Sequence, residues 1–200
     1  VEERELAPLA ELARRARENG VDGVRELGPE QMREIEPAVR GIRALHVPVT
    51  GVIEFRDVAR TLAREIEAAG GKILPGRRVV SIMEGPADVA ISTTGGDVVA
   101  RSLITCAGLH SDRLAAMTGH RDDVRIMPVR GDYYNLSERV AARVRALIYP
   151  VPDPAYPFLG VHFTRTIHDH VHAGPNAGLA FAREGYRRRA VSMGDVGEML

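Results

Sequence analysis

The run LITCAGLHSD, which begins at Leu103, is the sequence feature that most constrains the fold of this chain. An apolar stretch ends at Ala107 and Gly108, and a polar turn that starts a helix follows it. Gly108 has no Cβ and Ala107 has a minimal one, so we expect main-chain amides here to lie against a flat or phosphorylated ligand. The pattern predicts a fully buried strand over the LITC stretch and a short helix capped by Ser111 or Asp112.

The composition is that of an ordinary globular protein, with 44% hydrophobic and 27% charged residues in a chain of 200. Lysine and arginine number 27 and so do aspartate and glutamate, so the formal net charge is zero and no basic field attracts nucleic acid. No apolar stretch approaches the roughly 18 residues of a membrane span, and the first residues do not resemble a signal peptide. We therefore expect a cytoplasmic protein with no nucleic-acid partner and no transmembrane segment, and peripheral association with the inner membrane stays open.

The single cysteine, Cys106, excludes an internal disulfide and is typical of a reducing compartment. Because it ends an apolar stretch, a small buried side chain is favoured over a reactive thiol.

Hydrophobic periodicity and turn residues predict alternating helices and short strands in the first 120 residues. The succession of a helix, a Gly-Gly stop and strands is typical of an α/β crossover that feeds a sheet. We expect helices over 2–18, 28–35, 54–69 and 110–117, strands over 42–47, 72–74 and 78–83, and a hairpin of 89–93 with 97–101.

From Val124 onward the chain changes to alternating, aromatic and proline-punctuated segments. This texture predicts longer, antiparallel strands with an insertion around 137–145, and we interpret the region as a substrate lobe. The tail over 187–200 carries no clear period.

Three histidines, His168, His170 and His172, alternate in a predicted strand and would therefore point to one face. Imidazoles spaced in this way can converge on zinc. However, no Asp, Glu or Cys is spaced to complete a tetrahedron, apart from Asp169, which would point the other way. We therefore predict no metal site and interpret the segment as a solvated or pocket-rim strand.

Two other histidines are better placed for chemistry. His162 lies in an apolar strand that follows a proline-rich run, and His46 lies beside a Pro/Gly turn. The alternative for each is a satisfied core histidine. Arg130 and Arg165 are candidates to hold an anionic substrate by forked hydrogen bonds to a carboxylate, and the alternative for each is a surface ion pair.

The usual cofactor fingerprints are missing from the sequence. It contains no Gly-x-Gly-x-x-Gly run, no Walker loop and no Gly-x-Ser-x-Gly elbow. The junction at Ala107 and Gly108 is therefore the nearest thing to a cofactor signal.

Six motifs, taken in order, resemble the L-2-hydroxyglutarate oxidase or dehydrogenase branch of the FAD-dependent, D-amino-acid-oxidase-like oxidoreductases. The resemblance runs from about residue 5 to Tyr186, and the proline-rich run with the phrase that ends in Arg165 is its most specific part. The motifs are LHVPVTG (45–51), TCAGLHSDR (105–113), PVRGDYY (128–134), LIYPVPDP (147–154), the segment 157–165 and AGPNA (173–177).

This resemblance implies roles for individual residues. Val79 matches the position whose backbone meets the adenine end of FAD, and Ala107, Gly108 and Leu109 match the junction along the dinucleotide. The residues that match the substrate-lobe segments facing the flavin ring are His46, Tyr133, His162 and Arg165. We predict His162 or His46 as the catalytic base and Arg165, Arg130 and Tyr133 as substrate-binding residues.

The implied activity is that of an enzyme. It is FAD-dependent oxidation of a small 2-hydroxy acid, L-2-hydroxyglutarate to 2-oxoglutarate, by hydride transfer to flavin. The electron acceptor stays open. Two alternatives also stay open: an amino-acid or amine oxidase of the glycine or sarcosine oxidase type, and a non-catalytic binding module.

The expected fold class is mixed α/β (α+β), with part of the FAD-binding lobe and a substrate lobe built on a largely antiparallel sheet. The family's N-terminal dinucleotide-binding βαβ unit is not expected within this chain, so we interpret the chain as a fragment. The expected segments are a helical segment (1–41), a substrate-lobe strand with part of the FAD-binding lobe (42–123), a substrate-binding lobe (124–186) and an unstructured or truncated tail (187–200).

Overall fold

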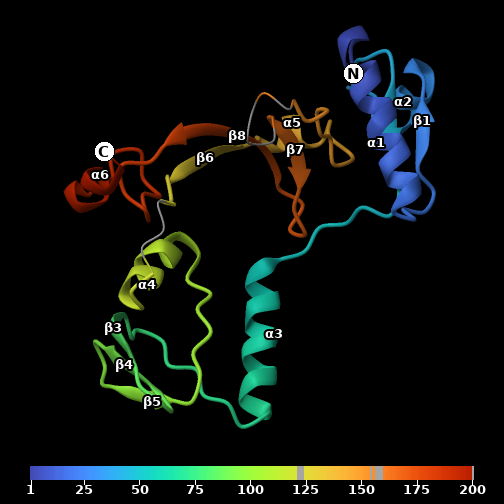
Figure 1. The fold of residues 1–200 in the computed structure, drawn as a ribbon. Helices are drawn as coiled ribbons and strands as arrows, with labels where there is room; N and C mark the ends of the chain where they lie inside the picture. The colour runs from blue at the N-terminus through green and yellow to red at the C-terminus, as the bar shows by residue number, and fades with distance from the viewer. Residues whose placement is uncertain (121–123, 154, 156–159, 200) are drawn as a thin grey trace. The chain divides into compact units, whose positions relative to one another are not determined.

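A computed structural model describes residues 1–120, 124–153, 155 and 160–199 (Figure 1). Helices alternate with short strands, and every sheet pairing with a described register is antiparallel. The mixed α/β class with antiparallel sheets that the sequence predicts is therefore confirmed. No helix among the described residues is long and apolar enough to cross a membrane.

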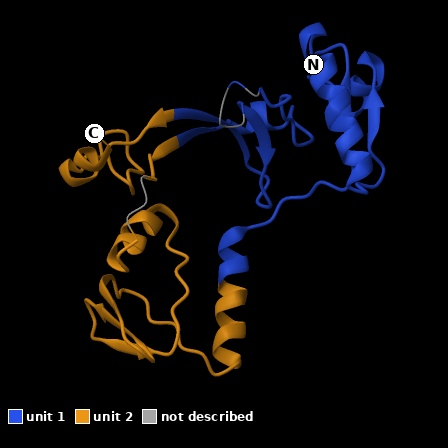
Figure 2. Ribbon diagram, in the orientation of Figure 1, with its two compact units in different colours: residues 1–59, 131–177 blue, residues 60–130, 178–200 orange. Residues whose placement is uncertain are grey.

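The chain divides into two compact units, each built from two separate stretches of sequence (Figure 2). Unit 1 comprises residues 1–59 and 131–177, and unit 2 comprises residues 60–130 and 178–200. The sequence analysis divides the chain into four segments by their expected roles. That division by role stays a prediction.

The N-terminal part of unit 1 contains a short 3-10 helix, η1, and two α-helices beside a two-stranded sheet. Leu9, Ala13, Leu27 and Met32 form its buried apolar side chains. Helix α2 begins at a proline, where the missing N–H costs nothing because the first turn has no intrahelical acceptor for it. The elements are η1 (Glu3–Glu5), α1 (Leu6–Glu18), β1 (Arg25–Leu27), α2 (Pro29–Ile35) and β2 (Ala44–His46), with β1 antiparallel to β2.

The second part of unit 1 is formed by a three-stranded sheet in the order β6-β8-β7 and a short helix. Val171 is almost fully buried and packs with Ala141 and Val144, and half-buried Ile148 and Phe163 lie against this cluster. The elements are β6 (Val129–Asn135), α5 (Glu138–Ala141), β7 (His162–Arg165) and β8 (Val171–Leu179); the first two residues of β6 and the last two of β8 belong to unit 2.

Unit 2 contains an antiparallel meander in the order β3-β4-β5, against which α4 packs through β3. Ile82 and Ile91 are its buried strand residues. The elements are α3 (Phe55–Ala68), whose first residues belong to unit 1, β3 (Val79–Glu84), β4 (Val89–Thr93), β5 (Val98–Ala100), η2 (Gly108–His110), α4 (Ser111–Met117) and α6 (Met193–Met199).

The predicted buried strand over 103–106 is wrong. These residues form no strand, Ile104 is 87% exposed, and Cys106, expected to be buried, is also exposed. A strand is stable only when neighbouring strands complete its hydrogen bonds, and no described strand pairs with this stretch. Residues 72–74, also predicted as a strand, are irregular.

The tail over 187–200 contains a helix. Residues 193–199 form helix α6, although no apolar period marks it in the sequence. Acidic side chains of α6 bind arginines elsewhere in unit 2, so charge pairing holds the helix where apolar periodicity does not.

Candidate functional site

Unit 1 holds a pocket of about 490 Å³ between the end of β2 with its following turn, the segment after α5 and the end of β7. His46, Arg145, Tyr149 and Arg165 are its largest polar lining residues. None of the lining residues is acidic, so the pocket presents two guanidinium groups without a carboxylate in its wall. The remaining lining residues are Leu45, Val47, Pro48, Thr50, Gly51, Val52, Ala146, Leu147 and Thr166.

Arg165 is anchored by the protein itself. Its Nη2 donates to the carbonyl oxygens of Ala141 at 3.3 Å and Val144 at 2.6 Å, and its Nη1 lies 3.3 Å from the carboxylate of Asp169. A guanidinium has five N–H groups, so the Nε–H and one Nη1–H stay available. The predicted carboxylate-binding role of Arg165 rests on those two donors.

His162 is buried, with 8% of its surface exposed, at the start of β7. Its Nδ1 lies 3.0 Å from the carbonyl oxygen of Gly160. A carbonyl only accepts, so Nδ1 carries the hydrogen and Nε2 is the acceptor of the neutral ring. His162 thus lies in a strand, as predicted, and its Nδ1–H is bound to the main chain.

An aromatic cluster surrounds His162. The ring stacks on Tyr149 with centroids 4.5 Å apart and meets the ring of Tyr133 edge-on at 6.0 Å. Tyr133 also lies 6.4 Å from the ring of His172. Because Tyr149 also lines the pocket, the cluster adjoins it.

His46 ends β2, and its Nδ1 lies 3.4 Å from Nη2 of Arg25. Its ring is half-buried and lines the pocket directly. The structure thus brings His46 and Arg165 to one pocket and places Tyr133 and His162 in the adjoining cluster of the same unit.

Arg130, the second predicted carboxylate-binding residue, belongs to unit 2 and donates to the carbonyl oxygen of Arg187 at 3.2 Å. It is not among the residues that line the pocket. Pro154 of the proline-rich run and residues 157–159 of the segment 157–165 lie outside the described residues.

The three alternating histidines do not share a strand. His168 and His170 lie in the turn between β7 and β8, and His172 lies in β8. Asp169 adopts φ 62° in this turn, which Thr166 closes by donating to the His170 carbonyl at 2.8 Å. Within residues 1–120, 124–153, 155 and 160–199, no group of three or more His, Cys, Asp or Glu residues is placed to hold a metal ion.

The junction at Ala107 and Gly108 turns through a left-handed residue. Gly108 has φ 53°, and a Cβ built on it would meet nothing within 4 Å. Leu109 is 38% exposed, and Val79 is half-buried at the start of β3, the strand against which α4 packs. The open main chain and the absent side chain fit a flat dinucleotide cofactor lying along this turn.

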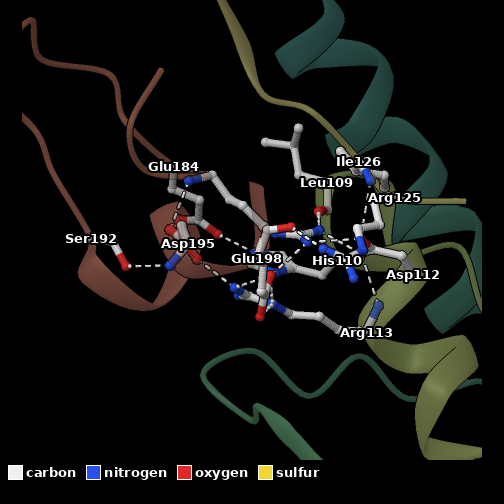
Figure 3. A network of polar contacts seen from close by, with 11 residues as sticks. Leu109, His110, Asp112, Arg113, Arg125, Ile126, Glu184, Ser192, Asp195 and Glu198 are labelled. Carbon is white, nitrogen blue, oxygen red and sulfur yellow. Dashed lines mark hydrogen bonds and ion pairs between the residues drawn. The ribbon is translucent and has the colours of Figure 1, made fainter. Parts of the chain in front are cut away.

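A polar network that the sequence reasoning missed lies directly after this turn (Figure 3). Arg183, with a side chain 4% exposed, forms a two-pronged ion pair with Asp112 and also donates to Glu198 at 2.8 Å. Arg113 pairs with Asp195 and Glu198 of α6. Asp112 and Arg183 are 71 residues apart, so no local pattern marks the pair.

Asp112 does not cap α4 as predicted, because its carboxylate is used elsewhere. Its oxygens accept from Arg183 and from the backbone N–H groups of Ile126 at 3.1 Å and Arg113 at 2.8 Å. The Arg183 guanidinium, followed by these two amides, holds the pKa of the Asp112 carboxyl well below its usual range.

The fold of the chain is similar to the folds of solved oxidases and dehydrogenases. Over 98% of the chain it resembles glycine oxidase from Geobacillus kaustophilus, with 22% identity and a TM-score of 0.68, covering 49% of that chain. It also resembles L-proline dehydrogenase from P. horikoshii, with 15% identity and a TM-score of 0.72, covering 51% of that chain.

Sequence comparison then defines the family. The family described as "FAD dependent oxidoreductase" (DAO) matches residues 1–200, and the chain belongs to it. Over 99% of the chain it is 44% identical to a protein named L-2-hydroxyglutarate dehydrogenase from Salmonella houtenae, covering 47% of that protein. The mitochondrial protein of that name from Homo sapiens is 39% identical over the whole chain, with 46% of its length covered. The chain therefore spans about half the length of the curated relatives it matches.

Proposed function

We propose that this chain provides the substrate pocket and one wall of the cofactor site of an enzyme that oxidises L-2-hydroxyglutarate to 2-oxoglutarate. The observation that carries the proposal is the pocket lined by His46, Arg145 and Arg165 with no acidic residue in its wall. The names of the curated relatives support the choice of substrate.

The two arginines account for a substrate with two carboxylates. Arg165 offers one remaining N–H group to one carboxylate from a guanidinium that the Ala141 and Val144 carbonyls hold in place. Arg145 is exposed, and its guanidinium makes no hydrogen bond or ion pair within the described part of the chain. It is available for the second carboxylate.

The hydroxyl proton of the substrate goes to a histidine. His162 is the better-prepared candidate because its Nδ1–H is bound to the Gly160 carbonyl, which leaves Nε2 to accept the proton. His46 is the second candidate, since its ring lines the pocket directly.

When bound, FAD, the cofactor of the family, would supply the acceptor for the hydride of the substrate carbon. In this proposal the main chain of Ala107, Gly108 and Leu109 and the backbone at Val79 lie against it. Gly108 suits this role because its positive φ and open surroundings leave the peptide accessible.

An amine or amino-acid oxidase of the glycine oxidase type is the alternative activity. The resemblance to glycine oxidase shows the fold alone at 22% identity. Glycine and sarcosine have one carboxylate, whereas the pocket is lined by two arginines, Arg145 and Arg165. The second arginine therefore favours a substrate with two carboxylates. A non-catalytic binding module is the remaining alternative, and a cytoplasmic location stays a prediction.

The natural polypeptide that carries residues 1–200 allows a direct test. It is purified, supplied with FAD and mixed without oxygen with L-2-hydroxyglutarate, D-2-hydroxyglutarate, glycine or sarcosine. The proposal expects loss of the visible flavin absorbance with L-2-hydroxyglutarate and not with the other three. Reduction by glycine or sarcosine would replace it with the amine oxidase function, and bound FAD that none of the four reduces would also overturn it.

A further inference from the structure

We propose that Arg183 is a positioning residue that fixes the conformation of the Gly108 turn for the cofactor. This inference rests on the proposed contact between that turn and FAD. Arg183 follows β8 in the sequence and reaches the turn from 74 residues away.

The geometry of Arg183 explains how it fixes the turn. Its Nη1 donates to the carbonyl oxygen of Leu109 at 2.6 Å and also pairs with Asp112 at the first turn of α4. Its Nη2 donates to the second oxygen of Asp112 at 2.7 Å. One planar group therefore binds both the turn and the helix that follows it, and it fixes the position of the turn relative to the helix.

Burial separates this contact from an ordinary surface ion pair. The side chain of Arg183 is 4% exposed and that of Asp112 is 16% exposed. Each Asp112 carboxylate oxygen accepts a hydrogen bond from Arg183 and a second one from a backbone N–H, that of Arg113 or Ile126. A lysine cannot satisfy this arrangement, because an ammonium lacks the fork that reaches both carboxylate oxygens and the Leu109 carbonyl together.

Helix α6 supplies further partners for Arg183. Glu198 accepts from Arg183 at 2.8 Å and from Arg113 at 2.8 Å, and Asp195 accepts from the backbone N–H of Arg183 at 2.9 Å. Arg183 is thus held at its main chain and at its guanidinium, so it behaves as a rigid support for the turn.

The test compares Arg183→Lys with Ile91→Ala, a control that removes a buried side chain from β4 in the same unit without touching the turn. The first measurement needs no cofactor. Amide signals of Gly108 and Leu109 are recorded by NMR in the natural polypeptide that carries this chain, without added FAD. We expect them to shift and to exchange faster with solvent in Arg183→Lys and to stay as in the parent in Ile91→Ala. Unchanged signals in Arg183→Lys would overturn the inference.

The second measurement is the dissociation constant for FAD in the natural polypeptide that carries this chain, at a temperature where both variants are folded. We expect Arg183→Lys to bind FAD about tenfold more weakly, the equivalent of one lost charge-assisted hydrogen bond, and Ile91→Ala to stay within about twofold. Equal weakening in both variants would reduce Arg183 to a stability role and overturn the inference. A parent that binds no FAD would refute the proposed function, and the NMR measurement would still decide whether Arg183 fixes the turn.

Discussion

The buried carboxylate of Glu36 accepts a hydrogen bond from the backbone N–H of Arg145 at 2.8 Å, across 109 residues of sequence. The same oxygen accepts from the N–H of Ala146 at 2.9 Å. Arg165 meanwhile binds the carbonyls of Ala141 and Val144. The segment that follows α5 is therefore held on two sides. The Glu36 carboxylate binds its N–H groups, and the Arg165 guanidinium binds carbonyl oxygens just before it. These contacts fix the backbone from which Arg145 extends.

Replacing Glu36 with alanine should unfold unit 1 more readily. The change leaves two partly buried backbone N–H groups without an acceptor, which costs about 2–5 kcal/mol of unfolding free energy. Urea denaturation followed by circular dichroism measures the effect. Glu34→Ala, on the exposed side of α2, is the control and should change stability by less than about 0.5 kcal/mol. Equal stability of the two variants would contradict the assigned role of Glu36.

Strand β8 allows a matched pair of glycine substitutions. Gly174 has φ 155°, and a Cβ there would lie 2.8 Å from the Asp132 carbonyl oxygen and 2.8 Å from Cδ1 of Tyr133. Gly174→Ala should therefore lose about 2 kcal/mol or more. Gly178, in the same strand, has nothing within 4 Å of a Cβ, so Gly178→Ala should be nearly neutral. Thermal unfolding compares them, and a neutral Gly174→Ala would show that the approach of β6 to β8 is looser than described.

Local signals in the sequence predicted the local elements well. Pro29 marks the start of α2, the Gly70-Gly71 pair follows α3, and the turn at Gly95 and Gly96 joins β4 to β5, as expected. Such signals succeed because caps and turns depend on a few adjacent residues.

Features that depend on distant partners were not predictable in this way. The stretch over 103–106 has the apolar character of a buried strand. Whether it forms a strand depends on hydrogen bonds to a neighbouring strand, and the sequence of the stretch does not reveal whether such a neighbour exists. Arg183 looks like one charged residue among many until its partner Asp112 is known. The pocket follows the same rule. His46 and Arg165 were each singled out from the sequence as candidates, whereas Arg145, which lines the same pocket and whose N–H binds Glu36 across 109 residues, was not.

Acid should destabilise unit 2 through the Arg183 network. The pKa values of Asp112, Asp195 and Glu198 are lowered in the folded chain, by arginine for Asp112 and Glu198 and first by the backbone N–H of Arg183 for Asp195. A lowered carboxyl pKa gives stability that is complete above the unfolded-state pKa of about 4 and is lost as the pH falls toward the folded-state value. The free energy of unfolding should therefore fall as the pH drops below about 4.

Asp112→Asn isolates the contribution of one carboxylate to that pH dependence. The variant leaves Arg183 without its buried counter-charge, so stability at pH 7 should fall by about 3 kcal/mol, and the slope below pH 4 should become shallower. Asp22→Asn, in the exposed turn before β1, is the control and should leave both unchanged. A slope that stays as steep in Asp112→Asn would show that other carboxyl groups control acid unfolding.

Replacing His162 with glutamine should slow the proposed flavin reduction by about a hundredfold or more, because a glutamine cannot accept the hydroxyl proton. His168→Gln, in the exposed turn after β7, should leave the rate unchanged. Stopped-flow absorbance of the FAD-loaded natural polypeptide measures both rates. If His162→Gln reduces its flavin normally and His46→Gln does not, the base is His46. If neither variant is slowed, neither histidine is the base.

Arg145 should decide the preference for a second carboxylate. In Arg145→Gln the pocket keeps Arg165 but loses the guanidinium proposed to bind the far end of the substrate. The KM for L-2-hydroxyglutarate should rise by about tenfold to a hundredfold, equivalent to about 1.4–2.7 kcal/mol, while kcat/KM for L-2-hydroxybutyrate, which has one carboxylate, should stay within about twofold. Arg143→Gln is the matched control, because Arg143 is also exposed and lies two residues away but does not line this pocket. If kcat/KM falls equally for both substrates, Arg145 shapes the pocket but does not bind the second carboxylate. If the KM for L-2-hydroxyglutarate is unchanged, that carboxylate binds elsewhere.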